Sequence, residues 1–227
     1  MVNKLDWDSN FFGINIGELS DATADVSQDL AAYDLIIVRT ADDRDVQIPG
    51  FKAGFSEIKL VFAKQVGNGK VYGEGENVYK FDPASHNIET IYELAYESGK
   101  YSRFKLDHRF SADKFREMYR KWVDNSVNKT FADGVLVYSE QDTIMGFVTY
   151  KVSLDHALIG LIGVNPAFQR RGIGKRLLSA VENIAIAQGC TVLSIPTQEV
   201  NDTACEFYMK QSYVVHEKNY IKHYWKI

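Results

Sequence analysis

The sequence predicts an α/β (α+β) protein in which a mixed, mostly antiparallel sheet is flanked by helices and follows a smaller, truncated α/β unit. The apolar run at residues 157–164 leads into a glycine-bearing loop and a segment of helical period, which predicts a buried strand followed by a helix. Alternating segments within residues 135–152, broken by a turn signal, predict an antiparallel hairpin. Residues 66–76 hold four glycines and little apolar content, which predicts a boundary between two units, 1–70 and 71–227.

The first unit opens on a polar, aromatic-rich segment, residues 5–13, which is predicted to be a turn. Apolar runs, or alternation of apolar and polar residues, then predict three strands, at residues 14–19, 34–39 and 55–63. A short helix is expected at 21–33, and the charged segment 42–48 suits either a helix or a loop. These elements are too few to complete a domain alone.

The second unit is predicted to combine strands with helices. Its strands lie at residues 78–81, 135–138, 144–152, 157–164, 191–195 and, as one strand or two, 213–224. Its helices lie at residues 87–98, at 111–127, from the glycine-bearing loop to 189, and at 202–211. Asn87 is placed to cap the first of these helices, and Gly189 is placed to end the third.

The loop Gln169-Arg-Arg-Gly-Ile-Gly174 stands at the N-terminus of that third helix. Backbone N–H groups there have no intrahelical partner, and the helix dipole is positive at this end. Gly172 and Gly174 lack the Cβ atoms that would keep an anion from these amides, so the loop is predicted to bind a pyrophosphate. It does not match the Walker pattern, and Leu177 stands where the dinucleotide fingerprint needs a third glycine. The alternative is an ordinary strand-to-helix turn with two exposed arginines.

The pattern Gln-x-x-Gly-x-Gly after an apolar strand resembles the acetyl-CoA loop of the GNAT superfamily, the GCN5-related N-acetyltransferases. Residues 5–15 further resemble the N-terminus of bacterial dTDP-fucosamine acetyltransferases. Residues 101–104 and 122–125 resemble the middle segment of that family, and residues 201–208 its C-terminal helix. The resemblance spans nearly the whole chain. It implies a GNAT fold behind a truncated GNAT-like unit, and acetylation of the 4-amino group of a dTDP-linked amino sugar, dTDP-4-amino-4,6-dideoxygalactose.

The resemblance also implies that acetyl-CoA is the co-substrate and that it contacts the loop and the preceding strand. The amides of residues 171–175 would hold its pyrophosphate, and residues 161–164 would pair with the pantetheine arm as a peptide adds to a sheet edge. An N–H at or near Val164 would donate to the developing oxyanion, a contact that can contribute about 3 kcal/mol. Gly163 suits a bulge or a close approach, or simply eases packing. The implied cofactor contacts are Leu161, Ile162, Gly163, Val164, Gln169, Arg170, Arg171, Gly172, Ile173, Gly174, Lys175 and Asn201.

Tyr208 resembles the general acid of the family. A phenol titrates near 10 and a thiol near 8.5, so a departing thiolate can receive a proton from tyrosine with only a modest uphill bias. The alternative is one more amphipathic tyrosine on a helix, since the chain has thirteen. Asn201 is a cofactor contact by the same resemblance and a helix N-cap by its position, and the two roles are compatible.

The general base is less clear from the sequence. Direct attack of an amine on the thioester requires that the acceptor first lose a proton. Glu57 is one candidate, and water with backbone carbonyls is another. Glu57 points to the same side of a regular strand as Lys59, so the two side chains would alternatively form an ion pair. Lys59 itself occupies the place where the resemblance implies an acidic residue.

Three residues are expected to contact the acceptor. Arg103 offers a planar fork that matches a diphosphate, although an arginine beside aromatic residues can also simply cover the core. Phe104, with its neighbour Tyr101, would stack on a base or sugar. Phe12 lies in the matched N-terminal segment and would shape the acceptor pocket, although core packing is the usual role of such a residue.

Composition narrows the class of protein. The net charge of −4 favours neither nucleic acid nor an acidic membrane surface as a partner. Two cysteines form no disulfide framework, and the five histidines lack metal-ligand spacing, so no metal is predicted. With no signal peptide or long apolar run, a cytoplasmic protein is expected, and a homodimer is compatible with the resemblance. The alternatives are acetylation of another small amine or a peptide, and a non-catalytic acyl-CoA-binding module.

Overall fold

A single sheet runs through the computed structural model, which describes residues 2–20, 30–67 and 76–227. Within these residues the strand order is β1-β2-β3-β10-β4-β9-β8-β7-β6-β5. The strands are β1 (Asn3–Lys4), β2 (Ile16–Ser20), β3 (Leu35–Thr40), β4 (Phe51–Gln65), β5 (Val78–Lys80), β6 (Gly134–Glu140), β7 (Thr143–Ser153), β8 (His156–Val164), β9 (Val192–Gln198) and β10 (Val214–Lys226). Neighbouring strands are antiparallel except in the pairs β2–β3 and β8–β9. The prediction of a mixed, mostly antiparallel sheet is therefore confirmed.

Helices cover both faces of the sheet. They are α1 (Asp6–Phe12), α2 (Ile88–Ser98), α3 (Arg103–Leu106), α4 (Ala112–Val127), α5 (Ile173–Ala187) and α6 (Asp202–Lys210), with 3-10 turns η1 (Leu30–Ala32) and η2 (Pro166–Phe168). The alternation of β7 separates the two faces, because Phe147 is buried with α2 and α4 whereas Val148 is buried with α5. No helix in the described ranges is both long and apolar enough to cross a membrane.

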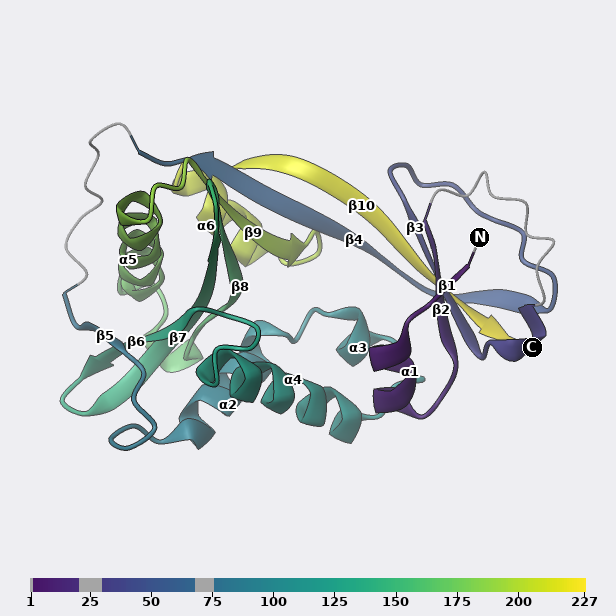
Figure 1. Cartoon of the computed structure of the whole chain (residues 1–227), viewed down its shortest axis with the longest axis horizontal. Helices are drawn as coiled ribbons and strands as arrows, with labels where there is room; N and C mark the ends of the chain where they lie inside the picture. Colours follow the sequence, from purple (N-terminus) through teal and green to yellow (C-terminus); the bar gives the residue numbers. More distant parts are fainter. Residues whose placement is uncertain (1, 21–29, 68–75) are drawn as a thin grey trace.

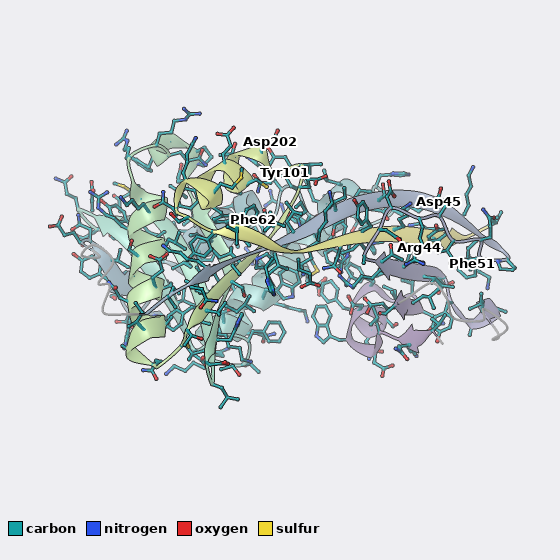
Figure 2. All side chains as sticks on the ribbon, turned by 90° about the horizontal axis from the view of Figure 1, so that it is seen from above. Arg44, Asp45, Phe51, Phe62, Tyr101 and Asp202 are labelled. Carbon is teal, nitrogen blue, oxygen red and sulfur yellow. The ribbon has the colours of Figure 1, made fainter. Side chains whose placement is uncertain are left out.

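Two long strands join the ends of the molecule. β4 and β10 run from the α5–α6 end to the end formed by α1 and β1–β3 (Figure 1). Figure 2 accordingly shows Phe62 and Asp202 toward the α5 side of the molecule, with Arg44, Asp45 and Phe51 near the opposite end. The sheet is thus continuous between the units predicted at 1–70 and 71–227, and that division stays a prediction. Most of the predicted boundary segment, residues 68–75, lies outside the described residues.

Local sequence signals explain several elements directly. The Asn87 side chain accepts a hydrogen bond from the Glu89 N–H at 3.0 Å and caps α2, as predicted. Ser111 caps α4 in the same way. The predicted hairpin is β6–β7, and its turn residues Gln141 and Asp142 both have positive φ, at 49° and 61°.

The first unit differs from its prediction at three places. Residues 6–12 form helix α1 rather than a turn, although the helix has no side-chain N-cap. It is held by tertiary contacts, including the stacked rings of Phe12 and Phe104, and it ends at Gly13 with φ of 70°. Strand β4 is longer than predicted at both ends because its whole length pairs with β10 or β9. The segment 42–48 is neither helix nor strand, and most of the helix predicted at 21–33 lies outside the described residues.

Candidate active site

The strands β8 and β9 are paired only where they begin. Their register runs from His156–Val192 to Leu158–Ser194 and then stops. Beyond it, residues 159–164 of β8 and 195–198 of β9 line one cavity of about 1130 Å³. The two strands therefore diverge, and the cavity enters the gap between them.

Backbone amides of β8 face this gap. The N–H groups of Leu161 and Asn165 donate away from it, to Thr149 Oγ1 at 2.9 Å and to a β7 carbonyl at 2.8 Å. Successive residues of a strand direct their N–H groups to opposite edges, so those of Ile162 and Val164 point into the gap. The gap thus offers unpaired strand amides to an extended ligand.

Gly163 marks a close approach between β8 and α2. A Cβ at this position would lie 2.7 Å from the Leu94 carbonyl oxygen and 3.0 Å from the Phe147 ring. The bulge in β8 lies instead at Gly160 and Leu161, which together face Thr149 of β7. The sequence allowed a bulge, a close approach or easier packing at Gly163, and the structure has the close approach.

The glycine-bearing loop turns into α5 through two left-handed residues. Arg170 has φ of 63° and Gly172 has φ of 81°. The first intrahelical bond is donated by the Arg176 N–H to the Gly172 carbonyl at 3.1 Å. The N–H groups of residues 173–175 therefore have no intrahelical acceptor and stand at the positive end of the helix dipole. This backbone cradle fits a pyrophosphate.

The polar side chains of the loop have different surroundings. The Gln169 amide donates to the Val164 carbonyl at 3.1 Å and so ties the loop to the end of β8. The Arg171 guanidinium lies over the Phe168 ring, 5.2 Å from its centroid, and outside the cavity wall. Gln169, Arg170 and residues 172–175 do line the cavity.

Tyr208 projects from α6 into the cavity wall. Its side chain is only 4% exposed, and its ring lies against Phe62, with 5.5 Å between the centroids. Burial, and secondarily the nearby Cys205, raises the pKa of the phenol well above its ordinary value. The phenol therefore stays protonated at neutral pH and can donate to a departing thiolate.

Asn201 caps α6 and lines the same cavity. Its Oδ1 accepts from the Ala204 N–H at 3.3 Å, and its Nδ2 lies 3.5 Å from Thr197 Oγ1. Capping uses the side-chain oxygen, so the amide group can still meet a ligand, as the sequence indicated.

A buried ion pair stands at the other end of the cavity. Glu57 of β4 accepts a hydrogen bond from the Arg103 backbone N–H at 3.0 Å, and its second oxygen lies 3.4 Å from the Arg103 guanidinium. Glu57 thus pairs with Arg103, rather than with Lys59 as one reading of the sequence had it. Both members of the pair line the cavity.

Aromatic rings support this ion pair. The Arg103 guanidinium lies over the Phe104 ring, 4.4 Å from its centroid. Phe104 in turn stacks on Phe12 at 5.5 Å. Phe104 lines the cavity, whereas Phe12 lies behind it, so the contribution of Phe12 to the acceptor pocket is indirect.

Several lining residues were not assigned from the sequence. They are Asp8 of α1, Lys59 of β4, Trp122 of α4, and Phe131. Burial raises the pKa of Asp8. Burial, followed by the charges of Arg39 and Arg103, lowers the pKa of Lys59. Two sequence signals could have assigned such residues to the site. Asp8 lies in the opening segment that resembles the family, and Lys59 lies two positions after Glu57.

His223 is absent from the cavity wall. Its Nδ1 pairs with Asp107, which also accepts from the Trp225 indole at 3.0 Å. No group of three or more His, Cys, Asp or Glu side chains that could hold a metal ion occurs in the part of the chain that the structure describes.

Comparisons with known proteins agree with this geometry. The model of the acetyltransferase (GNAT) family matches residues 88–213. The chain is 26% identical over 217 residues to the dTDP-fucosamine acetyltransferase of Escherichia coli O6:H1, covering 92% of this chain and 91% of that protein. It is 25% identical over 143 residues to the spore coat polysaccharide biosynthesis protein SpsD of Bacillus subtilis, covering 63% of this chain and 49% of SpsD. Among solved structures, a conserved protein of unknown function from Staphylococcus epidermidis shares the fold with a TM-score of 0.60 at 14% identity, over 94% of this chain and 85% of that one.

Proposed function

Because the chain belongs to the GNAT family of acetyltransferases, we propose that it transfers an acetyl group from acetyl-CoA to the amino group of a nucleotide-linked, dTDP-type amino sugar. The amine attacks the thioester directly. The observation that carries the proposal is one cavity with three features along it: a glycine-bearing helix N-terminus, the buried phenol of Tyr208 and the Glu57–Arg103 pair.

The roles on the thioester side follow from groups that face the cavity. The amides of residues 173–175 hold the pyrophosphate, and the amides of Ile162 and Val164 face the extended arm and the thioester carbonyl. An N–H aimed at that carbonyl oxygen stabilises the negative charge that develops during attack. Tyr208 gives its proton to the departing thiolate.

The roles on the acceptor side rest on charge and ring surfaces. Arg103 offers a guanidinium that pairs with a diphosphate, held in place by Glu57 and Phe104. Tyr101, Trp122 and Phe131 provide aromatic surface along the same wall. A charged and aromatic wall of this kind suits a nucleotide better than a bare alkylamine.

The sugar assignment is supported by the dTDP-fucosamine acetyltransferase, because the similarity to it extends over nearly all of both chains. It therefore includes β4, which lines the acceptor end of the cavity. An acetylated nucleotide sugar is a building block for a polysaccharide, which accords with the name of the Bacillus subtilis relative.

The test is thiol release from acetyl-CoA across a panel of dTDP- and UDP-linked amino sugars, with polyamines and peptides alongside. Rapid turnover with one nucleotide amino sugar is the expected result. Turnover only with free amines or peptides would contradict the sugar assignment while leaving acetyl transfer intact. Binding of acetyl-CoA with no turnover on any acceptor would favour a non-catalytic module.

A further inference from the structure

The proposed reaction needs a group that removes a proton from the acceptor. An amino sugar arrives largely as an ammonium ion, which has no lone pair for attack. The Glu57 carboxylate is already engaged by the Arg103 backbone N–H at 3.0 Å and lies 3.4 Å from the guanidinium. Both oxygens of Glu57 are therefore engaged by Arg103 rather than by an acceptor.

Lys59 stands two residues further along the same strand and on the same face as Glu57. It lines the cavity. It lies opposite Gln198, near the end of β9, and β9 leads through Asn201 into the helix that carries Tyr208. Lys59 therefore stands between the Glu57–Arg103 pair and the thioester side of the site.

The amine of Lys59 has no counter-ion within residues 2–20, 30–67 and 76–227. Among the residues that the structure describes, it forms no ion pair and no hydrogen bond, unlike the neighbouring cations. Arg39 pairs with Glu18, Arg103 with Glu57, and Lys100 with Glu97. A cationic side chain that is partly buried and unpaired in a cavity wall is less stable than the same cation in water.

The charges around Lys59 act in both directions. Burial, then Arg39 on β3 and Arg103 on α3, lowers its pKa, whereas Glu57 on β4 and Glu217 on β10 oppose this. Glu57 opposes it only in part, because its charge is shared with Arg103. The net effect is a pKa below the ordinary value of lysine, so the neutral amine forms more readily here than in a free lysine.

We propose that Lys59, as a neutral amine, takes the proton from the ammonium group of the acceptor, directly or through one water. Lys59 has this role only if the chain carries out the acetyl transfer proposed above. The ammonium gives one proton to Lys59, which later releases it to solvent. The free nitrogen forms the C–N bond as the C–S bond breaks, Tyr208 protonates the thiolate, and the second nitrogen proton restores the phenol. One ammonium and one thioester thus give one amide, one thiol and one released proton.

The decisive pair of variants is Lys59→Arg and Lys59→Met, assayed for kcat from pH 6 to pH 10. Arginine keeps the charge but cannot act as a base. Both variants should therefore lose about 100-fold or more in kcat near pH 7. Their kcat should then recover with rising pH, as the acceptor loses its own proton to solvent. Acetyl-CoA affinity should stay unchanged, and Lys52→Met, which removes an exposed lysine of the same strand, should behave as wild type.

A kcat retained by Lys59→Arg would overturn the assignment and show that only the charge matters. A loss of kcat near pH 7 that recovers at high pH in Glu57→Gln, with a wild-type profile in Lys59→Arg, would assign the base to Glu57. A second experiment needs no acceptor and no activity, so it tests Lys59 even if the wild-type protein acetylates none of the acceptors. The pH dependence of Lys59 labelling by acetic anhydride, read by mass spectrometry, should have a midpoint below about 10.4, the value of a free lysine. A midpoint at that value would overturn the inference on its own.

Discussion

His223 Nδ1 lies 2.7 Å from Asp107 Oδ2, and both side chains are almost completely shielded from solvent. Asp107 directly follows α3, the helix that carries Arg103 and Phe104. The pair therefore fastens the acceptor side of the site to β10. Burial raises the pKa of Asp107, but hydrogen bonds from His223, the Arg109 N–H and Trp225 together bring it below its ordinary value.

Folding stability should decrease in mild acid because of this pair. Burial lowers the pKa of His223 below its ordinary value of 6.5, and the described residues offer its Nε2 no hydrogen-bond partner. The unfolded chain then binds this proton more readily than the folded chain. The free energy of unfolding should be level above about pH 6.5 and fall below it, by up to about 1.4 kcal/mol per pH unit.

Urea unfolding at pH 7.5 and pH 5.5 measures this difference. His223→Asn should remove most of it, whereas His216→Gln, at an exposed position of the same strand, should leave it unchanged. An equal response of the two variants would mean that other groups cause the acid sensitivity.

Tyr208→Phe should lower kcat by about 100-fold or more with little change in acetyl-CoA affinity. The ring packs against Phe62 and remains in the variant, so only the proton donor is lost. Because burial raises the pKa of the phenol, the wild-type enzyme should show no loss of activity from tyrosine ionisation up to pH 10. Steady-state kinetics and equilibrium binding would separate the two effects. A variant with normal turnover would exclude Tyr208 as the acid.

Gly172→Ala should weaken acetyl-CoA binding, and Gly189→Ala provides a matched control. The two glycines flank α5 with nearly equal φ, 81° and 82°, so alanine at either should cost about 1–2 kcal/mol in backbone strain. Only Gly172 belongs to the loop at the cavity. Thermal unfolding should therefore shift similarly in both, while calorimetric titration with acetyl-CoA shows reduced affinity in Gly172→Ala alone. Equal affinities would contradict the pyrophosphate assignment.

Gly163→Ala should destabilise the fold by about 1–3 kcal/mol, because the new methyl group meets the backbone carbonyl of Leu94 at 2.7 Å. Backbone cannot rotate away as a side chain can. Gly54→Ala is the comparison, since its methyl group would meet side chains and no backbone atom, with Trp225 nearest at 3.1 Å and Arg109 at 3.8 Å. Urea unfolding should show the larger loss for Gly163→Ala, and the reverse order would contradict the close approach of β8 and α2.

The sequence predicted well those parts of the fold that depend on residues close together in the chain. The caps at Asn87 and Ser111, the turn at 141–142 and the loop before α5 depend on residues within a few positions of one another. Helix α1 was predicted as a turn because its seven residues carry no side-chain cap, and distant rings hold it in place. The ends of β4 were missed because polar residues such as Lys52 enter the strand by pairing with β10.

The same distinction holds at the site. The loop and Tyr208 carry recognisable local patterns. The partnership of Glu57 with Arg103 joins positions 46 residues apart, and that of Asp107 with His223 joins positions 116 apart. Nothing local to either residue encodes such a pair, so one sequence alone left Glu57 with several possible partners. Lys59 could be placed beside Glu57 but could not be shown to lack a counter-ion.

Strand β4 serves both sides of the reaction centre, since Glu57 and Lys59 face α3 whereas Ile58, Leu60 and Phe62 face α5 and α6. The spacing between these two sets is set by the pleat of one strand and not by any loop. A single inserted or deleted residue between positions 57 and 62 would turn one set to the opposite face. This stretch can therefore accept substitutions but not insertions or deletions. A change in acceptor preference would have to come from substitutions that keep the length of the strand.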